Sequence, residues 1–77
     1  MIFIYVRSPA SREIYVGTDY DNSFGVSPLT ISRQAGTWTF STVKNGAVDY
    51  RGRVIDVIDG TNITLDLQPV IPPEPIE

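Results

Sequence analysis

Few residues in this chain belong to the types that carry out chemistry. The 77 residues include no histidine and no cysteine. A histidine general base, a cysteine nucleophile and a zinc site of the Cys/His type are therefore excluded. The remaining candidates are two sets of oxygen-bearing side chains: Asp19, Asp21 and Asn22 in one segment, and the more widely separated Asp56 and Asp66.

The segment around Asp19 has the oxygen donors of a calcium loop without its pattern. An EF-hand needs a glycine at the sixth position and a glutamate at the twelfth, and counting from Asp19 these positions hold Phe24 and Thr30. Asp and Asn also serve turns. We interpret the segment as a solvated turn, with a weak calcium site as the alternative, and we predict no metal ion and no cofactor.

Asp56 and Asp66 would come close together if their strands paired. Two carboxylates about 5 Å or more apart could serve a glycosidase. Such an enzyme needs a cleft with walls, and a chain of 77 residues barely supplies a core. We therefore predict that the protein is not an enzyme and has no catalytic residues.

The net charge and the hydropathy pattern limit the classes of partner that the chain can bind. The net charge is −3, and residues 1–68 carry seven acids against six bases. A nucleic-acid binder that neutralises phosphates needs clustered Lys and Arg, so we expect no nucleic-acid partner. Only five apolar residues follow Met1 before Arg7, which is too short for a signal peptide or a membrane span. We expect synthesis in the cytoplasm without a signal peptide, and no membrane partner.

The elements that must position any site are strands, because apolar residues recur with a period of two. Asn45-Gly46 predicts a tight hairpin turn, and Gly52 predicts a bulge where the alternation of its strand changes parity. About six strands with frequent turns favour a single small antiparallel β-sandwich or open barrel. The predicted strands are residues 2–7, 13–17, a short strand at Leu29 and Ile31, 37–43, 49–57 and 62–67.

The chain divides at residue 68. Residues 1–68 form the predicted sandwich, and residues 69–77, "PVIPPEPIE", hold four prolines in nine positions. Proline lacks the N–H that a central strand requires, so we predict an extended Pro-rich C-terminal arm. A domain of this size buries only about 60% of its unfolded surface, and without disulfides or metals a partner is the remaining means of stabilisation.

Aromatic residues occur both in a strand and in a loop. Trp38 and Phe40 share a parity within a predicted strand, so we expect them to lie inside the sandwich and not to form an aromatic platform for a ligand. Tyr20 and Phe24 lie in the polar loop 18–27. Because Tyr and Phe are enriched at interface cores, we predict that they contact a partner. The alternative is that the loop folds back and they cap the sandwich.

The arm holds Val70, Ile71 and Ile76 among its prolines. Chain ends are commonly disordered, but solvated tails are generally poor in valine and isoleucine. We therefore predict that these three side chains dock onto a neighbouring subunit, and that Glu74 and Glu77 meet arginines there.

Several segments together resemble PEGA-type domains, which are small β-sandwich modules of microbial surface and envelope proteins. The segments are "SPASREIYVG", "SPLTI", "AGTWTFSTVKNG" and "DYRGRVIDVIDGTNITLDL". Ser11-Arg12 replaces the Gly-Ala of the family's namesake turn, and the 18–27 loop is longer and more acidic. The resemblance implies a sandwich fold and a binding or scaffolding role, with no catalysis and no transferable site residues.

These observations predict a non-enzymatic structural module that assembles with copies of itself or with a larger protein shell. A small chain that starts at its own Met1, lacks a signal and ends in an apolar arm resembles phage virion proteins that decorate or cement a capsid or form part of a tail. The alternative is a carbohydrate-binding or adhesion module of the cell envelope.

Overall fold

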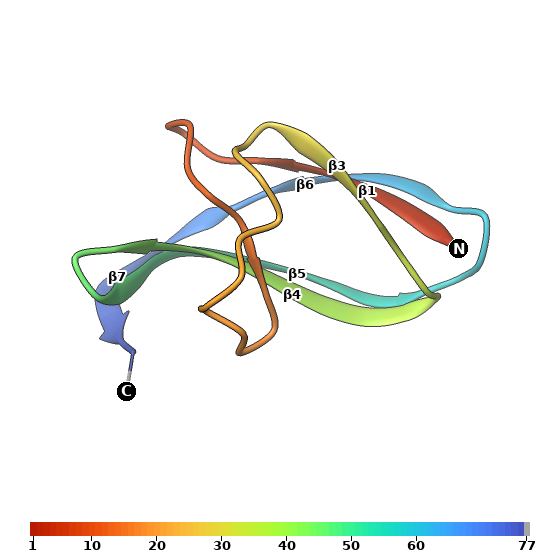
Figure 1. The fold of residues 1–77 in the computed structure, drawn as a ribbon. Helices are drawn as coiled ribbons and strands as arrows, with labels where there is room; N and C mark the ends of the chain where they lie inside the picture. The colour runs from red at the N-terminus through yellow and green to blue at the C-terminus, as the bar shows by residue number, and fades with distance from the viewer. Residues whose placement is uncertain (77) are drawn as a thin grey trace.

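The computed structural model describes residues 1–76. Over this range the chain forms strands and no helix, and so none that could span a membrane. The strands form two facing sheets in an elongated domain of 36 × 22 × 22 Å (Figure 1), which confirms the predicted all-β sandwich. They are β1 (Ile2–Arg7), β2 (Tyr15–Val16), β3 (Leu29–Arg33), β4 (Gly36–Lys44), β5 (Ala47–Val57), β6 (Asn62–Asp66) and β7 (Gln68–Pro75).

One sheet has three strands in the order β3-β1-β6. β1 lies at its centre, and its strict alternation gives it one fully buried face, formed by Ile2, Ile4 and Val6. β1 runs antiparallel to β3 and parallel to β6. The predicted antiparallel arrangement therefore has one exception, since β6 returns to β1 after crossing from the other sheet.

The second sheet has four strands in the order β2-β4-β5-β7, and all its pairs are antiparallel. Its long hairpin, β4–β5, turns at Asn45 and Gly46, with φ angles of 53° and 72°. Both angles lie in the left-handed region that a two-residue hairpin turn requires. The predicted turn is thus confirmed.

The C-terminal arm is part of this second sheet. Residues 68–75 pair with β5 and form the seventh strand, so the boundary predicted at residue 68 does not separate a free arm from the sandwich. The prolines explain the position of β7, because a strand at the edge needs N–H donors on one side only. Glu77 lies outside the described residues.

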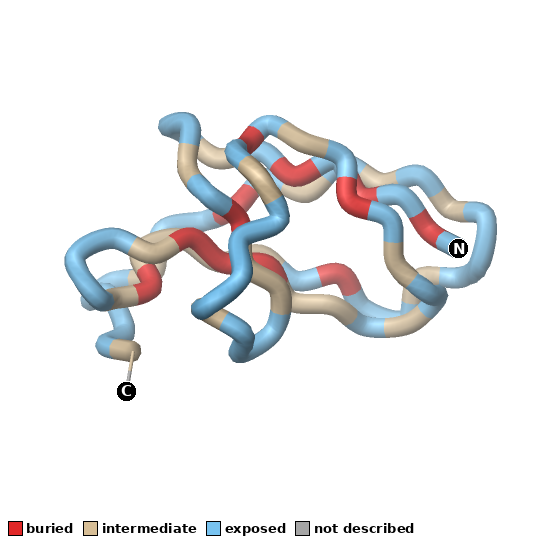
Figure 2. The backbone as a smooth tube through the Cα atoms, in the orientation of Figure 1, coloured by how far each residue is buried: buried red, intermediate tan, exposed pale blue. Residues whose placement is uncertain are grey.

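Side chains from both sheets fill one apolar core. Figure 2 shows the buried positions spaced along strands of both sheets. Phe40 is fully buried, while Trp38 is half-buried and packs against the core. The indole N–H of Trp38 donates to the carbonyl oxygen of Gln34 at 2.8 Å. The aromatic side of β4 therefore faces inward, as predicted, with Trp38 at the margin.

The bulge predicted at Gly52 is wrong in position. Gly52 pairs with Phe40, and the register between β4 and β5 shifts elsewhere, at Asp49 and near Asp56. Asp56 has a φ of 49°, in the left-handed region that aspartate tolerates better than most residues. Glycine occupies position 52 because a Cβ there would lie 2.7 Å from Cδ2 of Leu67 in the facing layer.

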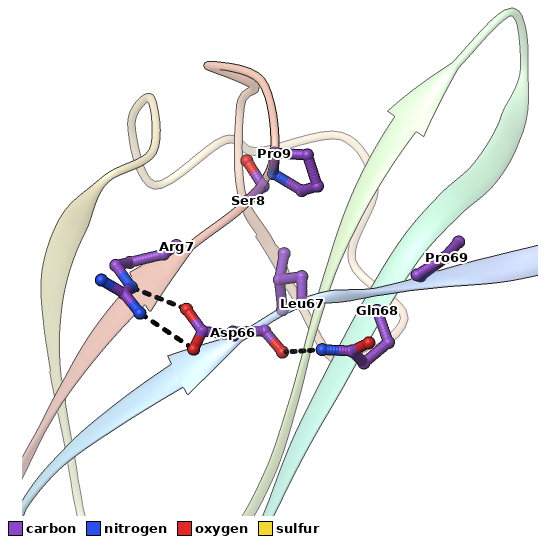
Figure 3. Close-up of a pocket in the computed structure, with 7 residues that line it drawn as sticks. All are labelled: Arg7, Ser8, Pro9, Asp66, Leu67, Gln68 and Pro69. Carbon is purple, nitrogen blue, oxygen red and sulfur yellow. Dashed lines mark hydrogen bonds and ion pairs between the residues drawn. The ribbon is translucent and has the colours of Figure 1, made fainter.

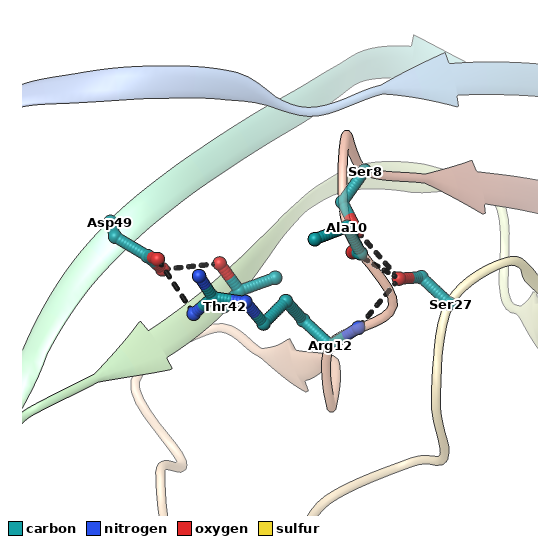
Figure 4. A network of polar contacts seen from close by, with 6 residues as sticks. All are labelled: Ser8, Ala10, Arg12, Ser27, Thr42 and Asp49. Carbon is teal, nitrogen blue, oxygen red and sulfur yellow. Dashed lines mark hydrogen bonds and ion pairs between the residues drawn. The ribbon is translucent and has the colours of Figure 1, made fainter.

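A polar network ties the long connection between β1 and β3 to the rest of the domain (Figure 4). Arg12 forms an ion pair of 2.8 Å with Asp49, and Thr42 donates to the same carboxylate. The hydroxyl of the buried Ser27 accepts from the Arg12 backbone N–H at 3.1 Å and lies 2.6 Å from the Ser8 hydroxyl. The connection is therefore cross-linked within itself through Ser27 and fixed to the four-stranded sheet through Asp49.

Candidate interaction surface

The C-terminal strand contains a protrusion. Pro69 pairs with Tyr50 and Glu74 pairs with Val48, so the single residue Asp49 of β5 lies opposite residues 70–73 of β7. The extra residues cannot lie flat along the edge of the sheet. Ile71, within this protrusion, is 86% exposed, whereas Val70 is half-buried. We refer to residues 70–73 as the protrusion.

The strand is fixed on both sides of its irregularity. The backbone N–H of Ile76 donates to the Gly46 carbonyl oxygen at 3.0 Å, and the Arg51 guanidinium donates to the Glu74 carboxylate. The hydrogen bond from Arg51 lowers the pKa of Glu74 below its ordinary value, and the charge of Arg51 adds to the effect. Glu74 therefore meets an arginine of its own chain, and not one of a neighbour as predicted.

Two of the predicted interaction residues come together beside this ion pair. Tyr20 and Ile76 line one hollow of about 320 Å³, together with Arg51 and Glu74. The Tyr20 ring also lies 6.2 Å from the ring of Tyr15, centroid to centroid. The 18–27 loop and the end of the arm, which are far apart in sequence, thus form one surface.

A second hollow continues this surface over the outer face of β4 and β5. It has a volume of about 370 Å³, shares Tyr20 and Arg51 with the first, and adds Thr39 and Arg53. Arg53 is exposed and forms no ion pair with any described residue. The outer face of the four-stranded sheet therefore offers a free cation next to the Tyr20–Ile76 hollow.

Phe24 lies apart from these hollows. Its ring stacks on the Arg33 guanidinium, whose central carbon lies 4.4 Å from the Phe24 ring centroid and 5.5 Å from that of Trp38. The Arg33 Nε is buried and has no hydrogen-bond partner, so the two aromatic rings are its main surroundings. With 43% of its surface exposed, Phe24 caps this cation, which matches the alternative in which the loop folds back.

The acidic residues singled out from the sequence lie on different elements among the described residues. β5 and β6 belong to different sheets, so Asp56 and Asp66 are not cross-strand neighbours. The Asp19 carboxylate accepts from the Asp21 backbone N–H at 3.1 Å, a local turn interaction. No group of three carboxylates able to hold a metal ion occurs in residues 1–76.

Asp66 is held in a form unsuited to acid catalysis. The Arg7 guanidinium donates to both oxygens of the Asp66 carboxylate, at 2.6 and 3.0 Å, beside a hollow of about 430 Å³ (Figure 3). These hydrogen bonds, with the charge of Arg7, lower the pKa of Asp66. A general acid needs a raised pKa, so the lowered pKa argues against Asp66 in that one role.

Sequence reasoning did not identify Arg51 as part of this surface. Arg51 and Arg53 were recognisable only as a close basic pair on one strand, and the pairing of Arg51 with Glu74 depends on β7 lying next to β5. The spacing of Tyr20 and Ile76 along the chain carries no signal of their proximity.

Comparisons of the chain with protein-family models, curated proteins and solved structures give no match. The resemblance to PEGA-type domains therefore stays a prediction.

Proposed function

We propose that this chain is a non-enzymatic assembly module that binds copies of itself or a larger protein shell through the protrusion and the adjoining Tyr20–Ile76 hollow. The observation that carries the proposal is the 86% exposure of Ile71. An aliphatic side chain presented in this way has no role in the packing of its own domain, and burying it against a partner supplies about 1.5–3 kcal/mol.

The neighbouring side chains suit the rest of such an interface. Tyr20 and Ile76 are half-buried within a shallow hollow, so a partner side chain can complete their burial without a rearrangement of the sheet. Arginine and tyrosine are enriched among residues that dominate binding energy, and Arg53 adds a cation with no partner among the described residues. Anchoring of the arm at Ile76 and Glu74 lowers the entropy lost on association.

We assign this module to a phage virion, as a capsid decoration, cement or tail protein. Support comes from the small sandwich, its thin core and its exposed apolar protrusion, which suit a subunit stabilised by its neighbours. The assignment has its own test: an antibody raised against the chain should label phage particles purified from producing cells. If the antibody does not label these particles, the virion assignment is wrong and the chain assembles at another location.

The test of assembly compares two exposed isoleucines. Ile71→Ser removes the apolar side chain from the protrusion, and Ile58→Ser makes the same change at the β5–β6 turn, where Ile58 is 75% exposed. The turn and β7 lie at opposite ends of the molecule (Figure 1). The Ile58 variant therefore controls for general loss of exposed hydrophobic surface.

The molar mass of each variant in solution should be measured by size-exclusion chromatography with light scattering, at chain concentrations from low micromolar to near-millimolar. We expect the unaltered chain and Ile58→Ser to associate, and Ile71→Ser to remain a monomer with an unchanged circular dichroism spectrum. Because a larger shell is the other partner considered, both variants should also be tested for incorporation into particles. Unchanged association and unchanged incorporation of Ile71→Ser would overturn the proposal.

A further inference from the structure

The outer face of the three-stranded sheet carries two aromatic side chains that the core does not use. Because Ile2, Ile4 and Val6 of β1 point inward and are fully buried, Phe3 and Tyr5 point outward. They are 44% and 39% exposed. β1 is the central strand, so both rings lie in the middle of the face and not at an edge.

Each aromatic residue has a polar neighbour on both sides. In the sheet register, Phe3 lies between Ser32 of β3 and Asn62 of β6, and Tyr5 lies between Thr30 and Thr64. These four neighbours are exposed. Adjacent strands lie about 4.8 Å apart, so hydroxyl and amide groups flank each ring at close range.

The face is uncharged around its aromatic residues. The nearest ionised groups along the strands form two pairs: Arg7 with Asp66 through two hydrogen bonds, and the Met1 ammonium with Asp59. A hollow of about 250 Å³ lies beside the rings, lined by Phe3, Tyr5, Thr30, Asn62, Ile63 and Thr64. A ligand with a net charge would find no free counter-charge here.

We propose that this face binds a neutral glycan. A sugar ring presents C–H groups on its faces and hydroxyls around its rim. The C–H groups suit the negative face of an aromatic ring, and the rim hydroxyls can exchange hydrogen bonds with Ser, Thr and Asn side chains on either side. An aliphatic partner surface would instead desolvate four polar side chains without replacing their hydrogen bonds, which is costly.

Successive outward residues of a strand lie about 6.6 Å apart, so Phe3 and Tyr5 can each contact a different sugar unit of one chain. The site therefore favours an oligosaccharide over a monosaccharide. This proposal uses the sheet opposite to the one that bears the protrusion and does not depend on the assembly proposal.

The test is a titration of the ¹⁵N-labelled chain with neutral oligosaccharides, namely cellohexaose, maltohexaose and hexa-N-acetylchitohexaose. We expect at least one of them to shift amide resonances of β1, β3 and β6. Trp38 fluorescence should stay constant, because Trp38 lies on β4 in the other sheet. If none of the three binds, or if shifts map to the other sheet, the proposal is overturned.

Variants locate the site. Tyr5→Ala should raise the Kd about tenfold, the equivalent of losing one stacking contact, and Ile55→Ala on β5 should leave the Kd unchanged. Thr64→Val keeps the side-chain shape and replaces the hydroxyl with a methyl group, so it tests the site even if Tyr5→Ala perturbs the fold. An unchanged Kd in both Tyr5→Ala and Thr64→Val would overturn the proposal.

Two further outcomes would also count against it. Tighter binding of an anionic polysaccharide such as polygalacturonate at the same resonances would contradict the neutral class of ligand. Concentration-dependent shifts of the same resonances without any sugar would indicate that a second copy of the chain covers this face.

Discussion

β1 and β7 show two ways in which a strand is held in this small domain. β1 has a hydrogen-bonded neighbour on each side and three fully buried side chains. β7 has one neighbour, its register is broken by residues 70–73, and Val70 is its only half-buried residue. The difference indicates that β1 is central to the apolar core, whereas β7 is held at the edge of its sheet mainly by backbone pairing and the Arg51–Glu74 ion pair.

The same comparison separates side chains that stabilise the fold from side chains that a partner can reach. The inward side of β1 is inaccessible to a partner. The prolines of β7 prevent another strand from pairing along the outer edge, because they lack N–H donors. A partner of β7 must therefore be recognised through side chains, of which Ile71 is the most exposed large hydrophobic one.

The largest effect is expected from Ile4→Ala in β1. Truncation of a fully buried isoleucine costs about 2–5 kcal/mol, while domains of this class hold about 5–15 kcal/mol in total, with small ones at the lower end. We expect most of the free energy of unfolding to be lost, as measured by urea denaturation followed by circular dichroism. Near-native stability of this variant would show that β1 is not the centre of the core.

Gly52→Ala tests the contact between the two layers. A methyl group there would lie 2.7 Å from Leu67 and 3.0 Å from Leu65, and such overpacking costs about 1–3 kcal/mol. We expect a lower urea midpoint with an unchanged slope. Leu67→Val in the same chain should recover part of the loss, and additive effects of the two changes would argue against the close approach.

The strands of strict alternation could be predicted from sequence. β1 occupies residues 2–7 as predicted, because the alternation of Ile2, Ile4 and Val6 with Phe3 and Tyr5 specifies both the period and the buried face. The same alternation contained the signal for an exposed aromatic pair. Trp38 and Phe40 form a second aromatic pair of one strand parity, but that side of β4 faces inward.

Pairing partners could not be predicted in this way. Nothing local in residues 62–66 distinguishes a parallel from an antiparallel neighbour, and the prolines of residues 69–75 exclude a central strand without excluding an edge strand. Gly52 has the sequence signature of a bulge, but the approach of Leu67 explains it. The Tyr20–Ile76 hollow depends on these long-range pairings. Residue types alone could therefore indicate Tyr20 and Ile76 as candidates, but not that the two lie close together.

A smaller effect is expected from acidification, which weakens the attachment of β7. The folded pKa of Glu74 lies below its unfolded value because Arg51 donates a hydrogen bond to the carboxylate. The pair therefore contributes stability above the unfolded pKa, and this contribution is lost as the pH falls through the folded pKa.

The measurement is hydrogen exchange of the Ile76 amide, which bonds the Gly46 carbonyl. Relative to amides of β1, its protection should fall across that acid range. Glu74→Gln should show reduced protection at neutral pH and a flat response to acid. A matching pH response in the Gln variant would assign the effect to another group, such as Asp66, whose pKa is also lowered.

The smallest effect on stability is expected from Ile71→Ala, the same chemical change as Ile4→Ala made in the other strand. Ile71 is 86% exposed and lies outside the core, and surface substitutions of this kind change the free energy of unfolding by about 0.5 kcal/mol or less. Urea denaturation of the two variants under one set of conditions measures the contrast directly. If Ile71→Ala destabilises the isolated monomer as much as Ile4→Ala, then the protrusion packs against its own domain in solution, and the distinction between a core strand and an attached strand is wrong.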